Sequence, residues 1–140
     1  RETAFQRVEE YSDAVDVMVR DSPESFDKDY FGPGAGLWLA QAGKQVAGCI
    51  ALRPLRSIEQ AGEIKRLYVQ PSGRGKGIGR GLLNLLEQAA LEAGCGLMVL
   101  ETGPSQPEAM RLYERQGFRR CGPFGDYRDD PLSVFMQKIL

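Results

Sequence analysis

The stretch Arg74-Gly75-Lys76-Gly77-Ile78-Gly79-Arg80 decides the fold of this chain. It separates an apolar run typical of a strand, Ile64 to Val69, from a run with helical periodicity, Gly81 to Ala93. A glycine-rich turn that opens a helix directs several backbone N–H groups at one point, and the helix dipole adds positive charge there. The pattern therefore predicts a phosphate-binding turn surrounded by three cationic side chains.

The spacing within this stretch excludes two common phosphate motifs. A P-loop requires Ser or Thr after its Gly-Lys pair, whereas a third glycine follows Gly75-Lys76 here. A dinucleotide fingerprint requires a final glycine where this chain has Arg80 or Leu82, depending on where the motif starts. The spacing that fits is [QR]-x-x-G-x-[GA], with Arg74, Gly77 and Gly79 in its fixed positions.

At these residues the chain resembles the GCN5-related N-acetyltransferase (GNAT) family, which holds the pyrophosphate of acetyl-coenzyme A with such a loop. Glu63–Pro71 resembles the family's fourth strand, and Leu97–Thr102 resembles its fifth. Ala109–Phe118 is similar to the family's A-x-x-L-Y-x-x-x-G-F helix and exit turn. The resemblance covers roughly Gly36 to Leu140, and we expect one such domain over residues 1–140. A glycine-rich turn without a ligand is the alternative for the loop taken alone.

Composition limits the classes of protein to which the chain can belong. Its 140 residues suffice for one domain with a buried core, and the formal net charge is −1. Without a basic block we expect no nucleic-acid partner, and without a long apolar run or a secretory signal we expect no membrane association. The chain contains no histidine, which excludes histidine-based acid–base chemistry and most catalytic metal sites.

The cysteines indicate a cellular compartment. The three of them, Cys49, Cys95 and Cys121, are far apart and match neither a zinc site nor a disulfide framework. They favour a reducing cytoplasm and an enzyme without a metal. We expect them to be buried rather than nucleophilic, so that acetyl transfer occurs by direct attack in a ternary complex.

Hydrophobic periodicity gives the order of the elements. A capping box at Thr3–Gln6 and apolar residues at helical spacing predict a first helix from Thr3 to about Asp21, and Ser25–Tyr30 fits a short second helix. Apolar runs at Gly36–Ala40 and Val46–Leu52 predict a hairpin. Later strands are expected at 63–69, 97–102, 118–121 and 133–139, and later helices at 81–93 and 107–116.

This order of elements predicts an α/β fold with one mixed, mostly antiparallel sheet and helices on both faces. The resemblance adds the GNAT fold, in which the sheet splays between its fourth and fifth strands. The family also has a strand before its first helix. Because hardly any residue precedes Thr3, we expect that strand to be absent or cut away.

The resemblance implies which residues hold acetyl-coenzyme A. In the family the pantetheine arm lies between the fourth and fifth strands and pairs with main-chain groups, which are here those of Leu67, Tyr68 and Val69. An ordinary buried strand is the other interpretation of these three residues. The family's asparagine before the helix motif is replaced by the longer Gln106. The loop residues expected to hold the pyrophosphate are Arg74, Gly75, Lys76, Gly77, Ile78, Gly79 and Arg80.

Two side chains are the leading candidates for acid–base chemistry. Glu63 begins the fourth strand, where some members of the family place a catalytic glutamate, and it would deprotonate the amine through water. The alternative is a solvated carboxylate paired with Lys65, and Glu101 is a second candidate base. Tyr113 matches the tyrosine that commonly protonates the leaving thiolate in the family, although its spacing also fits a core position.

The acceptor is expected to be selected by the first helices together with the late loop, Gly122 to Leu132. The aspartates of this loop would attract a cationic amine and its aromatic rings would cover an alkyl chain, although a solvated loop with turn-forming residues fits equally. The residues expected to bind the acceptor are Glu101, Phe124, Asp126 and Tyr127.

The resemblance implies an N-acetyltransferase that moves an acetyl group from acetyl-CoA to the primary amine of a small molecule or peptide, with a homodimer possible. A non-catalytic acyl-CoA-binding regulatory module on the same fold is the alternative, and a transferase for a longer acyl group is a third reading.

Overall fold

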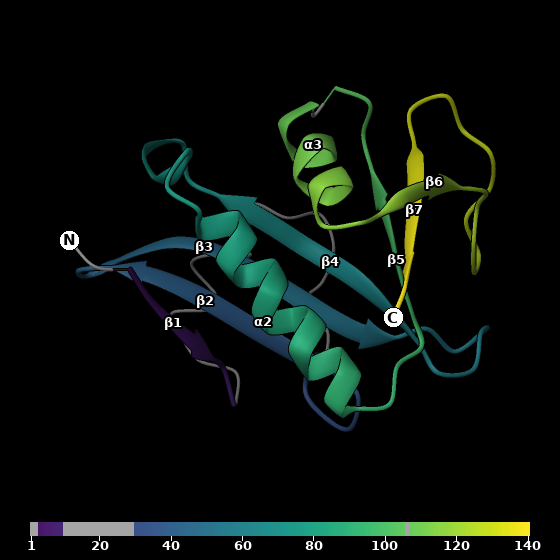
Figure 1. Cartoon of the computed structure of the whole chain (residues 1–140), viewed down its shortest axis with the longest axis horizontal. Coiled ribbons are helices and arrows are strands. Elements are labelled where there is room, and N and C mark those ends of the chain that lie inside the picture. The colour runs from purple at the N-terminus through teal and green to yellow at the C-terminus, as the bar shows by residue number, and fades with distance from the viewer. Residues whose placement is uncertain (1–2, 10–29, 106) are drawn as a thin grey trace.

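The computed structural model describes residues 3–9, 30–105 and 107–140, and in this part of the chain seven strands form one sheet (Figure 1). The strand order is β1-β2-β3-β4-β5-β7-β6. The strands are β1 (Thr3–Arg7), β2 (Gly36–Ala42), β3 (Gln45–Pro54), β4 (Ala61–Val69), β5 (Leu97–Thr102), β6 (Arg119–Cys121) and β7 (Val134–Ile139). The helices are η2 (Pro71–Gly73, 3-10), α2 (Ile78–Glu92) and α3 (Pro107–Arg115).

The sheet is mixed and mostly antiparallel, which confirms the predicted fold class. Among the described strands only β4 and β5 pair in parallel, and their register runs from Ala61 opposite Leu97 to Glu63 opposite Val99. Beyond Glu63 the two strands diverge, although β4 continues to Val69 and β5 to Thr102 (Figure 1). The predicted splay between the fourth and fifth strands is therefore present.

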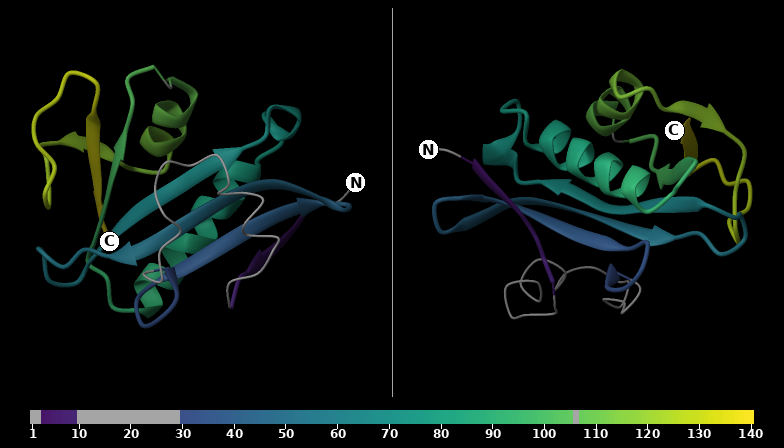
Figure 2. Two further views of the ribbon diagram at one scale, coloured as in Figure 1. Left: turned by 180° about the vertical axis from the view of Figure 1, so that it is seen from behind. Right: turned by 60° about the horizontal axis from the view of Figure 1, so that its bottom comes forward.

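Helices α2 and α3 lie on the same face of the sheet (Figure 2, right). The apolar stripe of α2 packs on β2, β3 and β4, and Tyr113 of α3 joins the same core cluster. Lys138 of β7 forms an ion pair with Glu87 of α2, and Gln116 donates to Asn84 at 2.6 Å. These contacts fix the end of α3 and strand β7 against the middle of α2.

The opposite face carries two smaller clusters of buried side chains. One lies over β2 and β3 and includes Leu37, Leu39 and Cys49. The other lies over β5 and β7, where Phe124 of the loop before β7 packs against Phe135. The two helices that the sequence predicts before Gly36 fall mostly on residues 10–29, which are outside the described part of the chain.

Strand β4 contains a β-bulge before the point where it enters the glycine-rich loop. The register with β3 shifts between Cys49 and Ala51, and Arg66 has a positive φ of 58°. Arg66 donates to the Tyr30 hydroxyl at 3.2 Å, and its carbonyl accepts from the Cys49 thiol at 3.0 Å. A bulge sharpens the local twist of a strand and is common near binding sites.

The predicted helix at Thr3 is wrong at its start. Thr3–Arg7 forms strand β1, paired antiparallel along its whole length with β2, and this edge strand occupies the position that was expected to be empty. The ring of Phe5 packs over Gly81, where an added Cβ would come within 2.6 Å of it. Pairing and this contact override the local capping signal. Val8 and Glu9 are not helical either, whereas residues 10–21 of that helix and 25–29 of the second helix lie outside the described residues.

Candidate functional site

The loop between β4 and α2 presents a row of unused backbone donors. Gly75 and Gly77 adopt positive φ angles of 77° and 78°, and an added Cβ at either would meet nothing within 4 Å. In the described part of the chain, no protein acceptor makes a well-formed hydrogen bond with the N–H groups of residues 75–80. Glycine is needed at both turns because side chains disfavour this conformation and would occupy the open space.

The charge around this loop favours an anion. Arg74, Lys76 and Arg80 are exposed, and the first turn of α2 has no acidic residue. Arg74 donates from Nε to the carbonyl of Val69 at 3.2 Å, which holds its side chain against the loop. A helix N-terminus with free N–H groups and nearby cations is an environment that favours phosphate groups.

Gly79 is needed for close packing, unlike the two preceding glycines, which face open space. An added Cβ there would lie 3.0 Å from Leu112 of α3 and 3.6 Å from Val69 of β4. The absence of a side chain at Gly79 therefore lets α2, α3 and β4 approach one another at the loop. This close packing brings the divergent end of β4 next to the unused donors.

The splayed part of β4 runs directly into this loop. Leu67 and Val69 are half-buried and Tyr68 is 50% exposed. None of the three pairs with β5 in the described register. Their backbone groups on the β5 side are thus available to an extended ligand that reaches the loop, as a strand added to an edge would be.

Glu63 is a buried carboxylate at the apex of the splay, with 2% of its side chain exposed. Its Oε1 accepts from Arg53 Nε at 3.1 Å and lies 3.0 Å from Arg53 Nη2. Its Oε2 accepts from the Tyr127 hydroxyl at 3.0 Å and lies 3.5 Å from Lys65 Nζ. Both cations and the phenol therefore compensate the buried charge, as a buried carboxylate requires.

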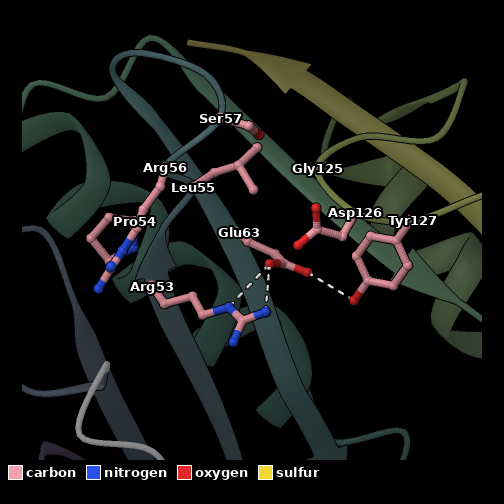
Figure 3. Close-up of a pocket in the computed structure, with 9 residues that line it drawn as sticks. All are labelled: Arg53, Pro54, Leu55, Arg56, Ser57, Glu63, Gly125, Asp126 and Tyr127. Carbon is pink, nitrogen blue, oxygen red and sulfur yellow. Dashed lines mark hydrogen bonds and ion pairs between the residues drawn. The ribbon is translucent and has the colours of Figure 1, made fainter.

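A pocket of about 610 Å³ opens above this carboxylate, between the β3–β4 connection and the late loop (Figure 3). Glu63 and Arg53 lie within it, Asp126 and Tyr127 border it on one side, and Leu55 borders it on the other. Its full lining is Arg53, Pro54, Leu55, Arg56, Ser57, Glu63, Gly125, Asp126 and Tyr127. A mixed apolar and charged lining of this size suits a small polar molecule.

Tyr113, the other candidate catalytic residue, lies on the α2 face of the sheet, opposite Glu63. It is 5% exposed and packs edge-to-face on Phe118, with ring centroids 5.7 Å apart. Burial raises the pKa of Tyr113, so its hydroxyl keeps its proton well above neutral pH. Within the described residues no hydrogen bond to that hydroxyl is present, which leaves its proton free for a ligand.

The other predicted acceptor residues are placed differently from one another. Glu101 accepts a hydrogen bond from Ser133 at 2.7 Å. Phe124 is 8% exposed and packs against both Tyr127 and Phe135, which also contact each other. Phe124 therefore supports the ring of Tyr127 through an edge-to-face contact, and Asp126 and Tyr127 border the pocket. Gln106 lies outside the described residues.

Sequence reasoning missed Arg53 and the segment 54–57 that borders the pocket. The dipeptide Arg53-Pro54 reads as an ordinary connection between strands, and no local signal marks it as a site. Among the described residues, no group of His, Cys, Asp and Glu side chains is arranged to hold a metal ion. In the same part of the chain, no helix has the length and apolar character needed to cross a bilayer.

Comparison with known proteins identifies several relatives. The profile of the acetyltransferase (GNAT) family matches residues 5–118. An IAA acetyltransferase of Azospirillum brasilense is 44% identical over 108 residues, which cover 77% of this chain and 70% of that protein. The uncharacterised N-acetyltransferase YsnE of Bacillus subtilis (strain 168) is 40% identical over 111 residues, which cover 78% and 72% of the two proteins.

Solved structures share the whole architecture. A Klebsiella pneumoniae protein, provisionally named an acyl-CoA N-acyltransferase, has a TM-score of 0.85 and 30% identity, covering 99% of this chain and 97% of that one. A Bacillus subtilis acetyltransferase solved in complex with CoA has a TM-score of 0.74 and 23% identity, covering 99% of each chain. The second likeness concerns the fold alone.

Proposed function

Because this chain belongs to the acetyltransferase (GNAT) family, we propose that it transfers an acetyl group from acetyl-CoA to the primary amine of a small molecule or peptide. The observation that carries this proposal is the row of unused N–H groups at residues 75–80, placed where the unpaired part of β4 ends. A pyrophosphate bound at the loop would lead its pantetheine arm along Leu67, Tyr68 and Val69. The thioester would then approach the apex at Glu63.

The proposed chemistry divides among the backbone and two side chains. A backbone N–H of β4 near the bulge would stabilise the developing oxyanion, a contribution of roughly 2.7–4 kcal/mol in comparable sites. As the C–N bond forms, the amine loses a proton toward Glu63, and the C–S bond breaks. Tyr113, which keeps its proton because of its raised pKa, would donate it to the leaving thiolate.

The acceptor site in this proposal is the pocket above Glu63. It lies on the face opposite α2 and Tyr113, so donor and acceptor would approach the apex from different sides of the sheet. This arrangement allows both substrates to be bound together, as direct attack requires. The three free cysteines fit a cytoplasmic enzyme, which we include in the proposal.

The proposal is tested by thiol release from acetyl-CoA in the presence of polyamines, amino acids, aminoglycosides and lysine peptides, together with calorimetry of CoA binding. Release that depends on one class of amine would support the proposal and identify the acceptor. Tight CoA binding without release from any amine would refute the transfer and favour a regulatory acyl-CoA-binding module. If thiol is released faster from a longer acyl-CoA than from acetyl-CoA, the transferred group is that longer acyl group and not acetyl.

A further inference from the structure

The hydroxyl of Tyr127 connects the buried carboxylate of Glu63 to the open pocket (Figure 3). It donates to Glu63 Oε2 at 3.0 Å and accepts from Lys65 Nζ at 2.7 Å. Its ring makes edge-to-face contacts with Phe124 and Phe135, at centroid separations of 5.1 and 5.5 Å. Both the ring and the oxygen of Tyr127 are therefore held in place.

Glu63 itself offers little to a molecule in the pocket. A carboxylate has about four acceptor positions. Arg53 fills two of them at Oε1 through Nε and Nη2, and Tyr127 and Lys65 approach Oε2. With only 2% of the side chain exposed, an acceptor amine has almost no direct access to these oxygens.

Tyr127 provides the missing access. A phenol oxygen has one donor and two acceptor positions. The donor is used on Glu63 and one acceptor position is used by Lys65, while the described residues supply no partner for the second acceptor position. Because Tyr127 borders the pocket, that position is open to an N–H group bound there.

We propose that Tyr127 is a catalytic residue that relays the proton of the acceptor amine to Glu63, a proposal that rests on the function proposed above. As the amine nitrogen bonds to the acyl carbon, its proton passes to the Tyr127 oxygen. The phenol's own proton passes at the same time to Glu63 Oε2, so the tyrosine ends neutral. The carboxylic acid then returns the proton to water. The C–S bond breaks, and the leaving thiolate takes its proton from Tyr113, which regains one from water.

The charges around the relay suit this sequence of steps. Lys65 places a positive charge 2.7 Å from the phenol oxygen, which stabilises negative charge that develops there during transfer. The attacking nitrogen becomes a much stronger acid than a free ammonium once it bonds to the acyl carbon. A carboxylate paired with Arg53 and Lys65 is therefore a sufficient final acceptor for its proton.

The variant Tyr127→Phe tests the relay because it removes the hydroxyl and keeps the ring that packs on Phe124 and Phe135. The control is Asn84→Ala on α2, which removes a side-chain hydrogen bond from Gln116 at 2.6 Å on the face of the sheet opposite the pocket. Steady-state rates are measured with a series of acceptor amines of graded basicity, and CoA affinity and melting temperature are measured for each protein.

For Tyr127→Phe we expect kcat to fall about 100-fold, the lower range for loss of a general base. We also expect the rate to depend more steeply on the basicity of the amine, while CoA affinity is kept. Asn84→Ala should retain a rate within about twofold of the wild type. A fluorinated tyrosine at position 127, which keeps the hydrogen bonds but has a more acidic phenol, should restore turnover with an altered dependence on amine basicity.

Three results would overturn the relay. A Tyr127→Phe variant with the wild-type rate and the wild-type dependence on amine basicity would refute it and leave the acetyltransferase function intact. A fall in rate that appears only as a higher KM, with the same dependence on basicity, would reduce Tyr127 to a structural support of the loop. Wild-type protein that binds CoA but acetylates no amine would refute the function and the relay together.

Discussion

Replacing Gly77 by alanine should separate the binding role of the loop from its contribution to stability. Gly77 has a φ of 78° and open space at its Cβ position. Gly94, at the other end of α2, has a φ of 84° and equally open space, so Gly94→Ala is a matched control. The two substitutions impose the same backbone strain, and only the first alters the row of unused N–H groups.

The expected loss of stability is similar at the two positions. A residue with a Cβ in the left-handed region costs roughly 1–2 kcal/mol, and the smaller entropy of the unfolded alanine chain offsets about 0.4–1 kcal/mol of this. Each variant should therefore lose about 1 kcal/mol of unfolding free energy, which corresponds to a decrease of about 4 °C in melting temperature for a domain of this size.

The expected effect on binding differs between the two positions. Alanine at position 77 favours a negative φ, which turns adjacent N–H groups away from an anion at the loop. Loss of one hydrogen bond to a charged group corresponds to about 1.5–3 kcal/mol, or roughly 10- to 150-fold weaker binding. Gly94→Ala should bind CoA with the wild-type affinity.

Calorimetry with CoA and thermal melting of both variants give the two quantities. If Gly77→Ala and Gly94→Ala bind CoA equally well while both melt about 4 °C lower, the loop is not the anion site and the assignment of residues 75–80 fails. If Gly77→Ala loses far more stability than Gly94→Ala, the left-handed turn at Gly77 supports the fold and the binding comparison must use Gly75→Ala instead.

Three further predictions concern buried groups. Glu63→Gln should lower the unfolding free energy by about 3–5 kcal/mol in urea titrations, because Arg53 and Lys65 lose their counter-charge; a loss below about 1 kcal/mol would show that water screens the site. Tyr113→Phe should lower kcat with CoA affinity kept. Burial raises the pKa of Tyr113, so its neutral form stabilises the fold below about pH 10, and this stabilisation is lost as pH rises above that value. The phenylalanine variant should therefore lose less stability than the wild type at alkaline pH. A melting temperature that falls with pH as in the wild type would contradict this. Burial raises the pKa of Cys49 to about 11, although a nearby cation and a backbone hydrogen bond act to lower it. Iodoacetamide at pH 8 should therefore label this thiol only after the protein is unfolded. Rapid labelling of the native protein, measured by mass spectrometry, would contradict this.

The sequence predicted the elements whose local signals agree with their packing. The strand into the loop, the helix that follows it and the parallel fifth strand all lie within a few residues of the expected bounds. Each combines a long apolar periodicity with a glycine turn, and the apolar face of each is buried in one core. In such segments local preference and tertiary contacts favour the same structure.

The same reasoning failed where distant contacts decide the structure. Thr3–Arg7 has a helix-capping pattern, but pairing with β2 and the contact of Phe5 with Gly81 make it a strand. The bulge at Arg66 could not be predicted, because the residue with the positive φ is not a glycine. Contacts of Arg66 with Tyr30 and Cys49 stabilise this conformation instead.

Most of the contacts of Glu63 could not be predicted from the sequence either. The alternative to a catalytic Glu63, a solvated carboxylate paired with Lys65, is right about the pair and wrong about the solvation, since the side chain is 2% exposed. The structure adds Arg53 from β3 and Tyr127 from a loop 64 residues later in the chain. A residue pair at such a separation leaves no periodic pattern, so only the folded sheet reveals the network at the apex.

Strands β4 and β5 pair over only three residues each, and this short pairing affects how the protein behaves without its ligand. Beyond Glu63 and Val99, the described β4 has an edge in the middle of the sheet, and unpaired strand edges are templates for unwanted association with other chains. An extended ligand with amide groups would cap this internal edge. The resistance of the protein to aggregation during storage should then depend on CoA. At a CoA concentration 100 times its dissociation constant, binding would add about 2.7 kcal/mol to the free energy of unfolding and suppress aggregation.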